Sequence, residues 1–232
     1  MPGSKFIVAL DGPAGAGKST VSRKLAERLD FALVDTGAIY RCIALAATRR
    51  GVDLSDDAHL KDLVEHARVR FQMQGGVNHV FLDDEDVTDA IRTPANSMAA
   101  STVSARPVVR AGLLQLQRRL AMEAPQRGAV LEGRDIGTVV FPDAEVKVFL
   151  DATVEERARR RHKELSQKGT PPPLEQILQE IIQRDLQDSQ RAAAPLKKAE
   201  DAYWVDSTQF PVEHIVDQVA TLVEQAMGTK KP

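Results

Sequence analysis

Short apolar runs alternate with amphipathic stretches along this chain, and that alternation predicts an α/β fold. Short apolar runs, typical of strands buried on both faces of a parallel sheet, lie at 6–10, 31–34, 129–131 and 203–205, and 146–150 is apolar apart from Lys147. The helical spacing of apolar positions predicts helices over 18–29, 36–50, 107–124, 153–167, 174–189 and 211–227. Thr36 is the predicted N-cap of the second helix. Strands separated by helices form βαβ units, so we expect a doubly wound parallel sheet flanked by helices.

The segment from Gly51 to Pro94 has a different pattern. A predicted helix over 57–66 is followed by two alternating runs, 69–73 and 77–82, on either side of a pair of glycines. Alternating residues around a glycine-rich turn are typical of a β-hairpin. We interpret the acidic run 83–86 as a solvated turn, because no histidine or cysteine accompanies it as a metal ligand.

The composition narrows the classes of function. The 232 residues are 43% hydrophobic and 28% charged, enough for one sizeable core with insertions. A formal net charge of −2 and 4% aromatic residues argue against a general polyanion binder and a stacking platform for single-stranded nucleic acid. We expect no signal peptide, and no apolar stretch reaches the roughly 20 residues of a membrane span. The single cysteine, Cys42, fits a reducing compartment, so we predict a cytoplasmic monomer without membrane or nucleic-acid partners.

The strongest local motif joins the first predicted strand to the first predicted helix. It fits the nucleotide-binding pattern Gly-x-x-x-x-Gly-Lys-Ser/Thr and comprises Gly12, Pro13, Ala14, Gly15, Ala16, Gly17, Lys18, Ser19 and Thr20. Glycines let successive backbone N–H groups point into one concavity, and the helix dipole favours anions there. We expect this loop to bind ATP, with Lys18 on the β- and γ-phosphates and Ser19 on Mg²⁺. The alternative is an ordinary glycine-rich turn with an exposed lysine.

A nucleotide-binding loop does not by itself separate kinases from GTPases and motor ATPases. The guanine-reading pattern Asn/Thr-Lys-x-Asp is absent, since Thr229-Lys-Lys-Pro232 lacks the aspartate, and the chain is short for a motor. A small-molecule phosphoryl transferase is therefore favoured. Such an enzyme has to neutralise two phosphates, which arginine does with bidentate hydrogen bonds. Ligands of open α/β sheets bind at the carboxyl ends of strands, which favours Arg134 and Asp135 over Arg118 and Arg119.

Four segments together resemble the bacterial cytidylate kinase family. They are the nucleotide-binding loop, Asp35-Thr-Gly-Ala-Ile-Tyr-Arg41, the block from Gly133 to Ala144, and the late segment from Arg184 to Leu196. The resemblance covers about residues 6–208 and implies a P-loop kinase fold: a five-stranded parallel sheet flanked by helices, an inserted NMP-binding domain and a short lid. The implied ranges are 1–50, 104–152 and 174–232 for the core, 51–103 for the inserted domain and 153–173 for the lid.

The resemblance also implies ATP-dependent phosphorylation of CMP and dCMP in pyrimidine nucleotide metabolism, by direct in-line transfer with Mg²⁺. The acceptor phosphate is assigned to Arg41, Arg134 and Arg191. Cytosine is assigned to Ser101, Arg110 and Asp135, and the ribose hydroxyls to Arg184 and Asp188. Two arginines of the lid, Arg157 and Arg161, are expected to close over the transferring group in catalysis. Glu132, at the end of the third core strand, is expected to contact the Mg²⁺ hydration shell.

The chemistry of cytosine supports the assignment of Asp135 independently. Cytosine presents an amine donor beside two acceptors, so a carboxylate accepts from the amine while an arginine or serine donates to the ring. Uracil presents the opposite pattern and would leave buried polar groups unpaired. The alternative for Asp135 is a structural salt bridge with Arg134 or a helix cap.

Several of the assigned residues also suit purely structural roles, and the chain as a whole suits two further functions. Arg157 and Arg161 suit surface pairs with Glu155, Glu156 or Glu164, and Ser101 suits simple packing. The chain also fits a kinase for another small acceptor, such as shikimate or a different nucleotide. A non-catalytic nucleotide-binding switch or RNA-associated module is supported by a cluster of arginines: Arg106, Arg110, Arg118, Arg119, Arg127 and Arg134.

Overall fold

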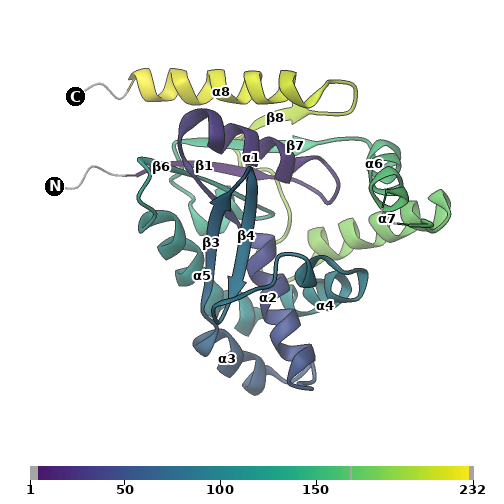
Figure 1. Cartoon of the computed structure of the whole chain (residues 1–232). Helices are drawn as coiled ribbons and strands as arrows, with labels where there is room; N and C mark the ends of the chain where they lie inside the picture. The colour runs from purple at the N-terminus through teal and green to yellow at the C-terminus, as the bar shows by residue number, and fades with distance from the viewer. Residues whose placement is uncertain (1–4, 168, 230–232) are drawn as a thin grey trace.

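The centre of the molecule is a five-stranded parallel sheet (Figure 1). The structure is a computed structural model that describes residues 5–167 and 169–229. The strand order is β2 (Ala32–Asp35), β6 (Gly128–Gly133), β1 (Phe6–Asp11), β7 (Val146–Asp151) and β8 (Tyr203–Asp206). Every neighbouring pair is parallel, which confirms the predicted fold class. The ends of the predicted core ranges, 1–4 and 230–232, and residue 168 of the predicted lid lie outside the described residues.

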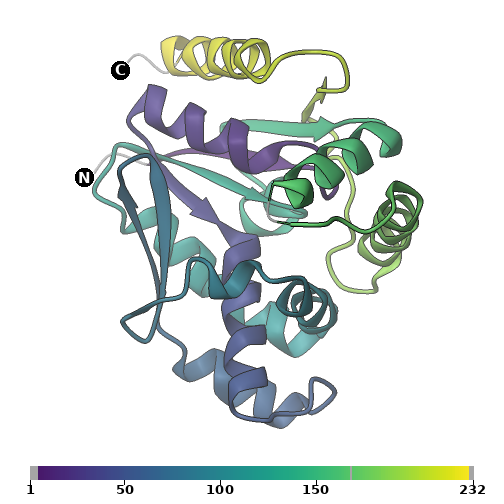
Figure 2. The ribbon, with the colours of Figure 1, turned by 45° about the vertical axis from the view of Figure 1, so that its right-hand side comes forward.

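Helices cover both faces of this sheet, as Figures 1 and 2 show. One face carries α1 (Lys18–Leu29) and α8 (Val212–Thr229), and the other carries α2 (Thr36–Arg49) and α5 (Pro107–Met122). In β1, Val8 and Leu10 pack with α1 and α8, whereas Ile7 and Ala9 pack in the cluster that includes α2 and α5. Both sets are buried, which explains why this strand is continuously apolar in sequence.

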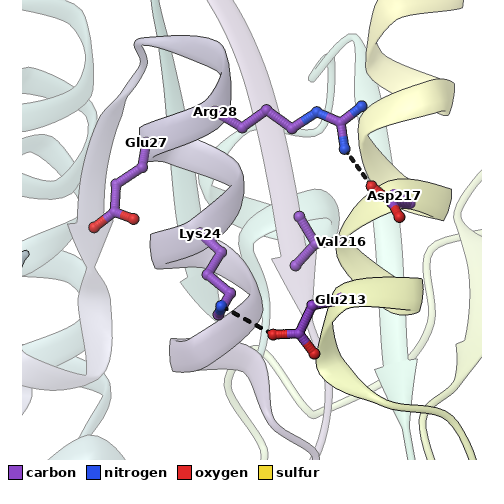
Figure 3. A pocket seen from close by; sticks show the side chains of 6 residues that line it. All are labelled: Lys24, Glu27, Arg28, Glu213, Val216 and Asp217. Atoms are coloured by element: carbon purple, nitrogen blue, oxygen red, sulfur yellow. Dashed lines mark hydrogen bonds and ion pairs between the residues drawn. The ribbon is translucent and has the colours of Figure 1, made fainter.

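Ion pairs join α1 to α8 at the surface. Lys24 lies 3.1 Å from Glu213 and Arg28 lies 2.5 Å from Asp217, across a shallow pocket between the two helices (Figure 3). Glu27, on the same stretch of α1, pairs with Arg23. Every charged side chain that lines this pocket is therefore engaged in an ion pair.

Two further helices lie beside the sheet, at the side where the loop between β1 and α1 emerges (Figures 1 and 2). They are α6 (Val154–Ser166) and α7 (Leu174–Gln190). Ala158 of α6 packs against Ile177 and Ile181 of α7 in a small apolar cluster of their own. Because this cluster is separate from the two clusters of the main sheet, the helix pair is a distinct packing unit.

Residues 51–103 contain the elements predicted for the insertion and three more. They form α3 (Asp57–His66), β3 (Val69–Gln74), β4 (Val77–Leu82), β5 (Glu85–Asp86), the 3₁₀ turn η1 (Ala90–Arg92) and α4 (Pro94–Ser104). The hairpin prediction is confirmed, since β3 and β4 pair antiparallel. The interpretation of the acidic run as a turn is only half right: Asp83 and Asp84 have positive φ, but Glu85 and Asp86 form a third strand against β4. The sequence lacked a signal for so short a strand.

Candidate active site

The carboxyl ends of three neighbouring strands bring the predicted site residues to one edge of the sheet. Asp11 ends β1, Asp35 ends β2 and Gly133 ends β6, and these strands lie in register. Asp35, and not Thr36 as predicted, caps α2: its carboxylate accepts from Ala38 N at 2.8 Å. Thr36 lies inside the helix and donates its hydroxyl to Glu132 O at 2.7 Å. The helix begins at Thr36, directly after the last residue of β2, so the last strand residue is also the cap.

The nucleotide-binding loop, residues 12–20, is a strained turn packed against β7 and α6. Gly12 has φ of 149°, and a Cβ atom there would lie 1.9 Å from Leu150 O. Gly15 has φ of 78°, and its Cβ would lie 3.1 Å from Arg157 Cβ. Only glycine fits a left-handed backbone at such close approach. The loop is therefore fixed in shape by its neighbours before any ligand binds, and we call it the phosphate loop from here on.

Lys18 is buried under its own loop. Its side chain is 7% exposed, and Nζ donates to Pro13 O at 2.6 Å, so the alternative of an exposed lysine is wrong. Burial lowers the pKa of Lys18 well below its usual value, and the positive charges of Arg134 and Arg184 lower it further. A cation held under this repulsion is stabilised by an anion placed between it and the arginines.

Ser19 and Glu132 form an oxygen-lined position beside the loop. The Ser19 hydroxyl donates to Glu132 Oε2 at 2.8 Å, and Ser22 lies 3.2 Å from the other carboxylate oxygen. Burial raises the pKa of Glu132 to about 7, and the nearby Asp35 carboxylate adds to this effect. Oxygen ligands of this kind fit Mg²⁺, which proteins commonly hold by one or two side chains together with substrate phosphates. Within 5–167 and 169–229, no group of three or more His, Cys, Asp or Glu is placed to hold a metal alone.

Five side chains form a buried chain of ion pairs on the opposite side of the site. They are Arg110, Asp135, Arg191, Asp188 and Arg134, and we call them the acceptor cluster. Arg110 lies 2.5 Å from Asp135, and Arg134 lies 2.9 Å from Asp188. Arg191 stands between the two carboxylates, 3.8 Å from Asp135 and 3.6 Å from Asp188. The alternative pairing of Asp135 with Arg134 is therefore wrong, and Asp135 provides no side-chain cap to the described turn after it.

A further set of cations converges between the phosphate loop and the acceptor cluster. Burial lowers the pKa of Arg184 to about 10, and the charges of Arg134, Arg41 and Arg161 contribute. Arg184 Nε is buried and makes no hydrogen bond within the described part of the chain. Arg41 is anchored by Asp35 at 2.8 Å. Three guanidinium groups from other segments thus act on the buried Arg184, an arrangement that favours an anion beside it.

The two predicted lid arginines occupy different environments. Arg157 is 6% exposed, lies 2.7 Å from Asp185 of α7, and donates to Ala14 O of the phosphate loop at 3.1 Å. It is not a surface residue. Arg161 is partly exposed and pairs with Glu164 at 2.8 Å, as the surface alternative describes, while lying close enough to Arg184 to affect its pKa.

The Ser101 side chain contacts α7 and does more than fill space within its own helix. Its hydroxyl lies 3.4 Å from Gln187 Oε1, so it links α4 to the helix that carries Arg184 and Asp188. This position is at the rim of the acceptor cluster. Its predicted contact with a base stays a prediction.

The arginine cluster that supported an RNA-associated module does not form one surface. Arg106 pairs with Asp57 at 2.8 Å, Arg118 donates to Val140 O at 2.8 Å, and Arg127 donates to Leu29 O at 3.5 Å. Arg110 and Arg134 belong to the acceptor cluster. These residues therefore serve separate contacts. No helix in the described residues is long and apolar enough to cross a membrane.

Two carboxylates at the site were not predicted from the sequence. Asp185 holds Arg157, as described above. Asp11 accepts hydrogen bonds from Ile136 N and Gly137 N, both at 2.8 Å, directly after Asp135. The only sequence signal for Asp11 was a carboxylate at the end of a buried strand, and it gave no indication of which groups it binds.

Comparisons with known proteins agree on one family. The family model described as Cytidylate kinase matches residues 8–225. A cytidylate kinase of Geobacter sulfurreducens is 50% identical over 220 residues, which are 95% of this chain and 93% of that protein. Cytidylate kinases of Syntrophotalea carbinolica and Pseudomonas aeruginosa are 48% and 49% identical, and the alignments cover 98% and 94% of this chain and 96% and 95% of those proteins.

Proposed function

The chain belongs to the cytidylate kinase family, and from this premise we propose that its site transfers the γ-phosphoryl group of ATP to CMP and dCMP. This activity is a step of pyrimidine nucleotide metabolism. We also propose a cytoplasmic enzyme, which the single free and buried cysteine, Cys42, supports. We propose that it works as a monomer and without a nucleic-acid partner, since Arg106, Arg118 and Arg127 are each engaged in a separate contact within the chain.

One observation carries the proposal. Lys18, Arg134, Arg184, Arg41 and Arg161 come from separate segments, yet Arg134 and Arg184 lower the pKa of Lys18, and Arg134, Arg41 and Arg161 lower that of Arg184. Repulsion between these cations does not stabilise the ligand-free protein. Binding of two phosphate groups between them would relieve it. A kinase whose acceptor is an uncharged alcohol needs fewer cations on its acceptor side.

In the proposed mechanism, the phosphate loop and Lys18 hold the β- and γ-phosphates of ATP. Mg²⁺, when bound with ATP, neutralises charge on these phosphates, and Ser19 together with Glu132 would hold it. Arg41, Arg134 and the neighbouring Arg191 hold the phosphate of CMP in line with the γ-phosphorus. The acceptor is already an anion, so no general base is required. Alignment, neutralisation of charge and exclusion of water supply the catalysis.

The acceptor cluster also provides the groups that distinguish cytosine from uracil. We assign Asp135 to accept from the exocyclic amine of cytosine, while Arg110 and Ser101 donate to the ring acceptors. Arg110 and Arg191 flank Asp135 and keep its carboxylate oriented. Arg184 and Asp188, on successive turns of α7, are assigned to the ribose hydroxyls. Residues 51–103 and 153–173 are proposed to act as the NMP-binding domain and the lid that close over both nucleotides.

A coupled assay of ADP production tests the proposal. We expect ATP consumption to depend on an added acceptor, with CMP and dCMP as the best acceptors and UMP and AMP as poor ones. Reactions without acceptor serve as the control for simple ATP hydrolysis. ATP hydrolysis that is independent of acceptor, or a preference for AMP, would contradict the proposed function.

A further inference from the structure

We propose that Asp11 is a positioning residue for the acceptor side of the reaction: its carboxylate fixes the turn that presents Arg134 and Asp135 to CMP. The inference rests on the proposed function. It assigns a role to a residue that makes no contact with the acceptor cluster itself but holds the backbone on which that cluster depends.

The geometry of the carboxylate is specific. Asp11 Oδ1 accepts from Ile136 N and Oδ2 accepts from Gly137 N, each at 2.8 Å. These two N–H groups are the first of the turn that begins directly after Asp135, and such groups have no partner within their own turn. Asp135 does not cap them with its side chain within the described structure. Asp11 therefore satisfies two backbone donors that would otherwise be buried and unpaired.

The turn itself is of a rare kind. Residues Ile136–Val140 form a single π-helical turn, with Val140 N donating to Asp135 O and Phe141 N donating to Ile136 O. Isolated π turns are uncommon and occur frequently at functional sites. A Cβ atom added at Gly137 would lie 3.2 Å from Lys147 Cδ and 3.5 Å from Asp11 Oδ2. The turn is thus clamped between β7 and Asp11, and its position sets that of Asp135.

Asp11 is a buried carboxylate whose two hydrogen bonds act against the cost of its burial. Asp11 is 5% exposed, and burial raises its pKa to about 6, against the lowering effect of the two N–H groups. Lys18 and Asp135 are the charged groups that face it. A carboxyl whose pKa is raised on folding binds protons more tightly in the folded state, so its ionisation at neutral pH lowers stability. The hydrogen bonds from Ile136 N and Gly137 N offset part of this cost, so the carboxylate is retained together with the turn that it holds.

The position of Asp11 in the chain links the two halves of the site. Asp11 directly precedes Gly12, the first residue of the phosphate loop, and it pairs in the sheet with Gly133. Asp11 therefore lies directly before the loop that is proposed to bind ATP, and it also anchors the turn that follows Asp135. Precise placement of Asp135 is what allows it to discriminate between cytosine and uracil, because a misplaced hydrogen bond loses most of its strength.

The substitution Asp11→Asn tests this role. Asparagine has the same shape but one oxygen acceptor, so its amide would face one of the two backbone N–H groups donor to donor. We expect the KM for CMP to rise about tenfold and the ratio of kcat/KM for CMP over UMP to fall by about tenfold, since an unpaired buried donor displaces the turn. The KM for ATP should stay within about twofold, because the hydrogen bonds of the phosphate loop are unchanged.

Asp56→Asn is the matched control. Asp56 also accepts two successive backbone N–H groups, from Ala58 at 3.0 Å and His59 at 3.1 Å, but it caps α3 at the surface. At Asp56 both N–H groups donate to Oδ1, which asparagine keeps, so Asp56→Asn removes the charge of a backbone cap and leaves its hydrogen bonds in place. Only Asp11→Asn should alter the use of CMP.

The outcomes separate this proposal from the proposed function. Failure of the unsubstituted protein to phosphorylate CMP would refute the proposed function. An active protein whose folded Asp11→Asn variant keeps its preference for CMP over UMP would overturn the positioning role. Equal rises in KM for ATP and CMP would do the same. Asp11→Ser, which keeps one acceptor, repeats the test if asparagine prevents folding, and failure of both variants to fold would make Asp11 a structural residue.

Discussion

The phosphate loop and the acceptor cluster face each other, yet the chain builds them in different ways. The phosphate loop is one contiguous segment, and its lysine is held by the loop's own Pro13 carbonyl. The acceptor cluster takes its members from α5, α7 and the segment after β6, and carboxylates of the cluster pair with its arginines. The loop thus offers unpaired positive charge to a ligand. The cluster is internally neutralised and recognises a ligand by rearranging existing pairs.

The pKa values of the carboxyl groups also differ between the two regions. Burial raises the pKa of Glu132, beside the phosphate loop, to about 7. In the acceptor cluster, burial opposes ionisation of Asp188, but Arg134, Arg184 and Arg191 together outweigh it and the pKa is lowered. The loop region is therefore sensitive to pH near neutrality, whereas the acceptor cluster keeps its charges. Binding of the donor is expected to depend on charge alone, and binding of the acceptor on charge and geometry.

Removing the lysine of the phosphate loop should have the largest effect. For Lys18→Ala we expect kcat/KM to fall about a thousandfold, because a preorganised cation at the transferring phosphate is lost. The fold should be retained, since burial lowers the pKa of Lys18 and its charge does not stabilise the empty protein. Kinetics and thermal unfolding check both statements. Lys24→Ala, on the exposed side of the same helix, is the control, and near-normal turnover of Lys18→Ala would contradict the role.

Breaking the acceptor cluster should affect selectivity and stability together. Asp135→Asn removes the charge between Arg110 and Arg191, and we expect a loss of about 3 kcal/mol in the free energy of unfolding. The ratio of kcat/KM for CMP over UMP should fall about a hundredfold. The amide of asparagine carries a donor as well as an acceptor, so it can also pair with the carbonyl of uracil. Asp143→Asn, an exposed aspartate later in the same sequence block, is the control. An unchanged ratio would remove Asp135 from base recognition.

The two regions also differ in how far the sequence predicted them. The phosphate loop and helix 18–29 were predicted residue by residue, because motif and periodicity are local. The residues of the acceptor cluster were identified by family resemblance, but their pairing was not predicted. Arg110 and Asp135 are 25 residues apart, and only the packing of α5 near the end of β6 brings them together. The pairing of Arg157 with Asp185 likewise depends on how α6 packs on α7.

Backbone hydrogen bonds to side chains were the least predictable feature. The π turn after Asp135 has no sequence signature, so the two donors that Asp11 satisfies were unknown. Thr36 is the predicted cap of α2, but Asp35 beside it is an equally good cap residue. The choice between them is made by where β2 stops, which is a property of strand pairing and not of local sequence.

The ion pair that connects the two regions should have an intermediate effect. Arg157 reaches from Asp185 of α7 to Ala14 O of the phosphate loop. For Asp185→Asn we expect kcat/KM to fall about tenfold, mostly through kcat, because Arg157 is left buried without its partner and the two halves lose a fixed spacing. Asp217→Asn removes an exposed pair of α8 with α1 and is the control, since such pairs contribute about 0–1 kcal/mol. Equal kinetics of both variants would show that the pair has no positioning role.

The smallest effect concerns the pH dependence of stability, which should come from Glu132 and Asp11 and not from the acceptor cluster. Glu132 has a folded pKa of about 7 against an ordinary value of 4.5, so the folded protein binds the proton more tightly. Its contribution is therefore lost as the pH rises through this window. We expect the free energy of unfolding to fall by about 1 kcal/mol per pH unit between pH 5 and 7, the slope that one proton bound only in the folded state produces.

Two variants identify which residues cause this dependence of the free energy of unfolding on pH. Glu132→Gln should flatten the decrease measured by urea unfolding at each pH, leaving the part due to Asp11, whose pKa of about 6 acts in the same direction. Asp188→Asn should lower stability by a similar amount at every pH in this range and leave the slope unchanged, because a carboxyl with a lowered pKa titrates only in more acidic solution. If Asp188→Asn flattened the slope and Glu132→Gln did not, the acceptor cluster would be the titrating region and the contrast between the two sides would be reversed.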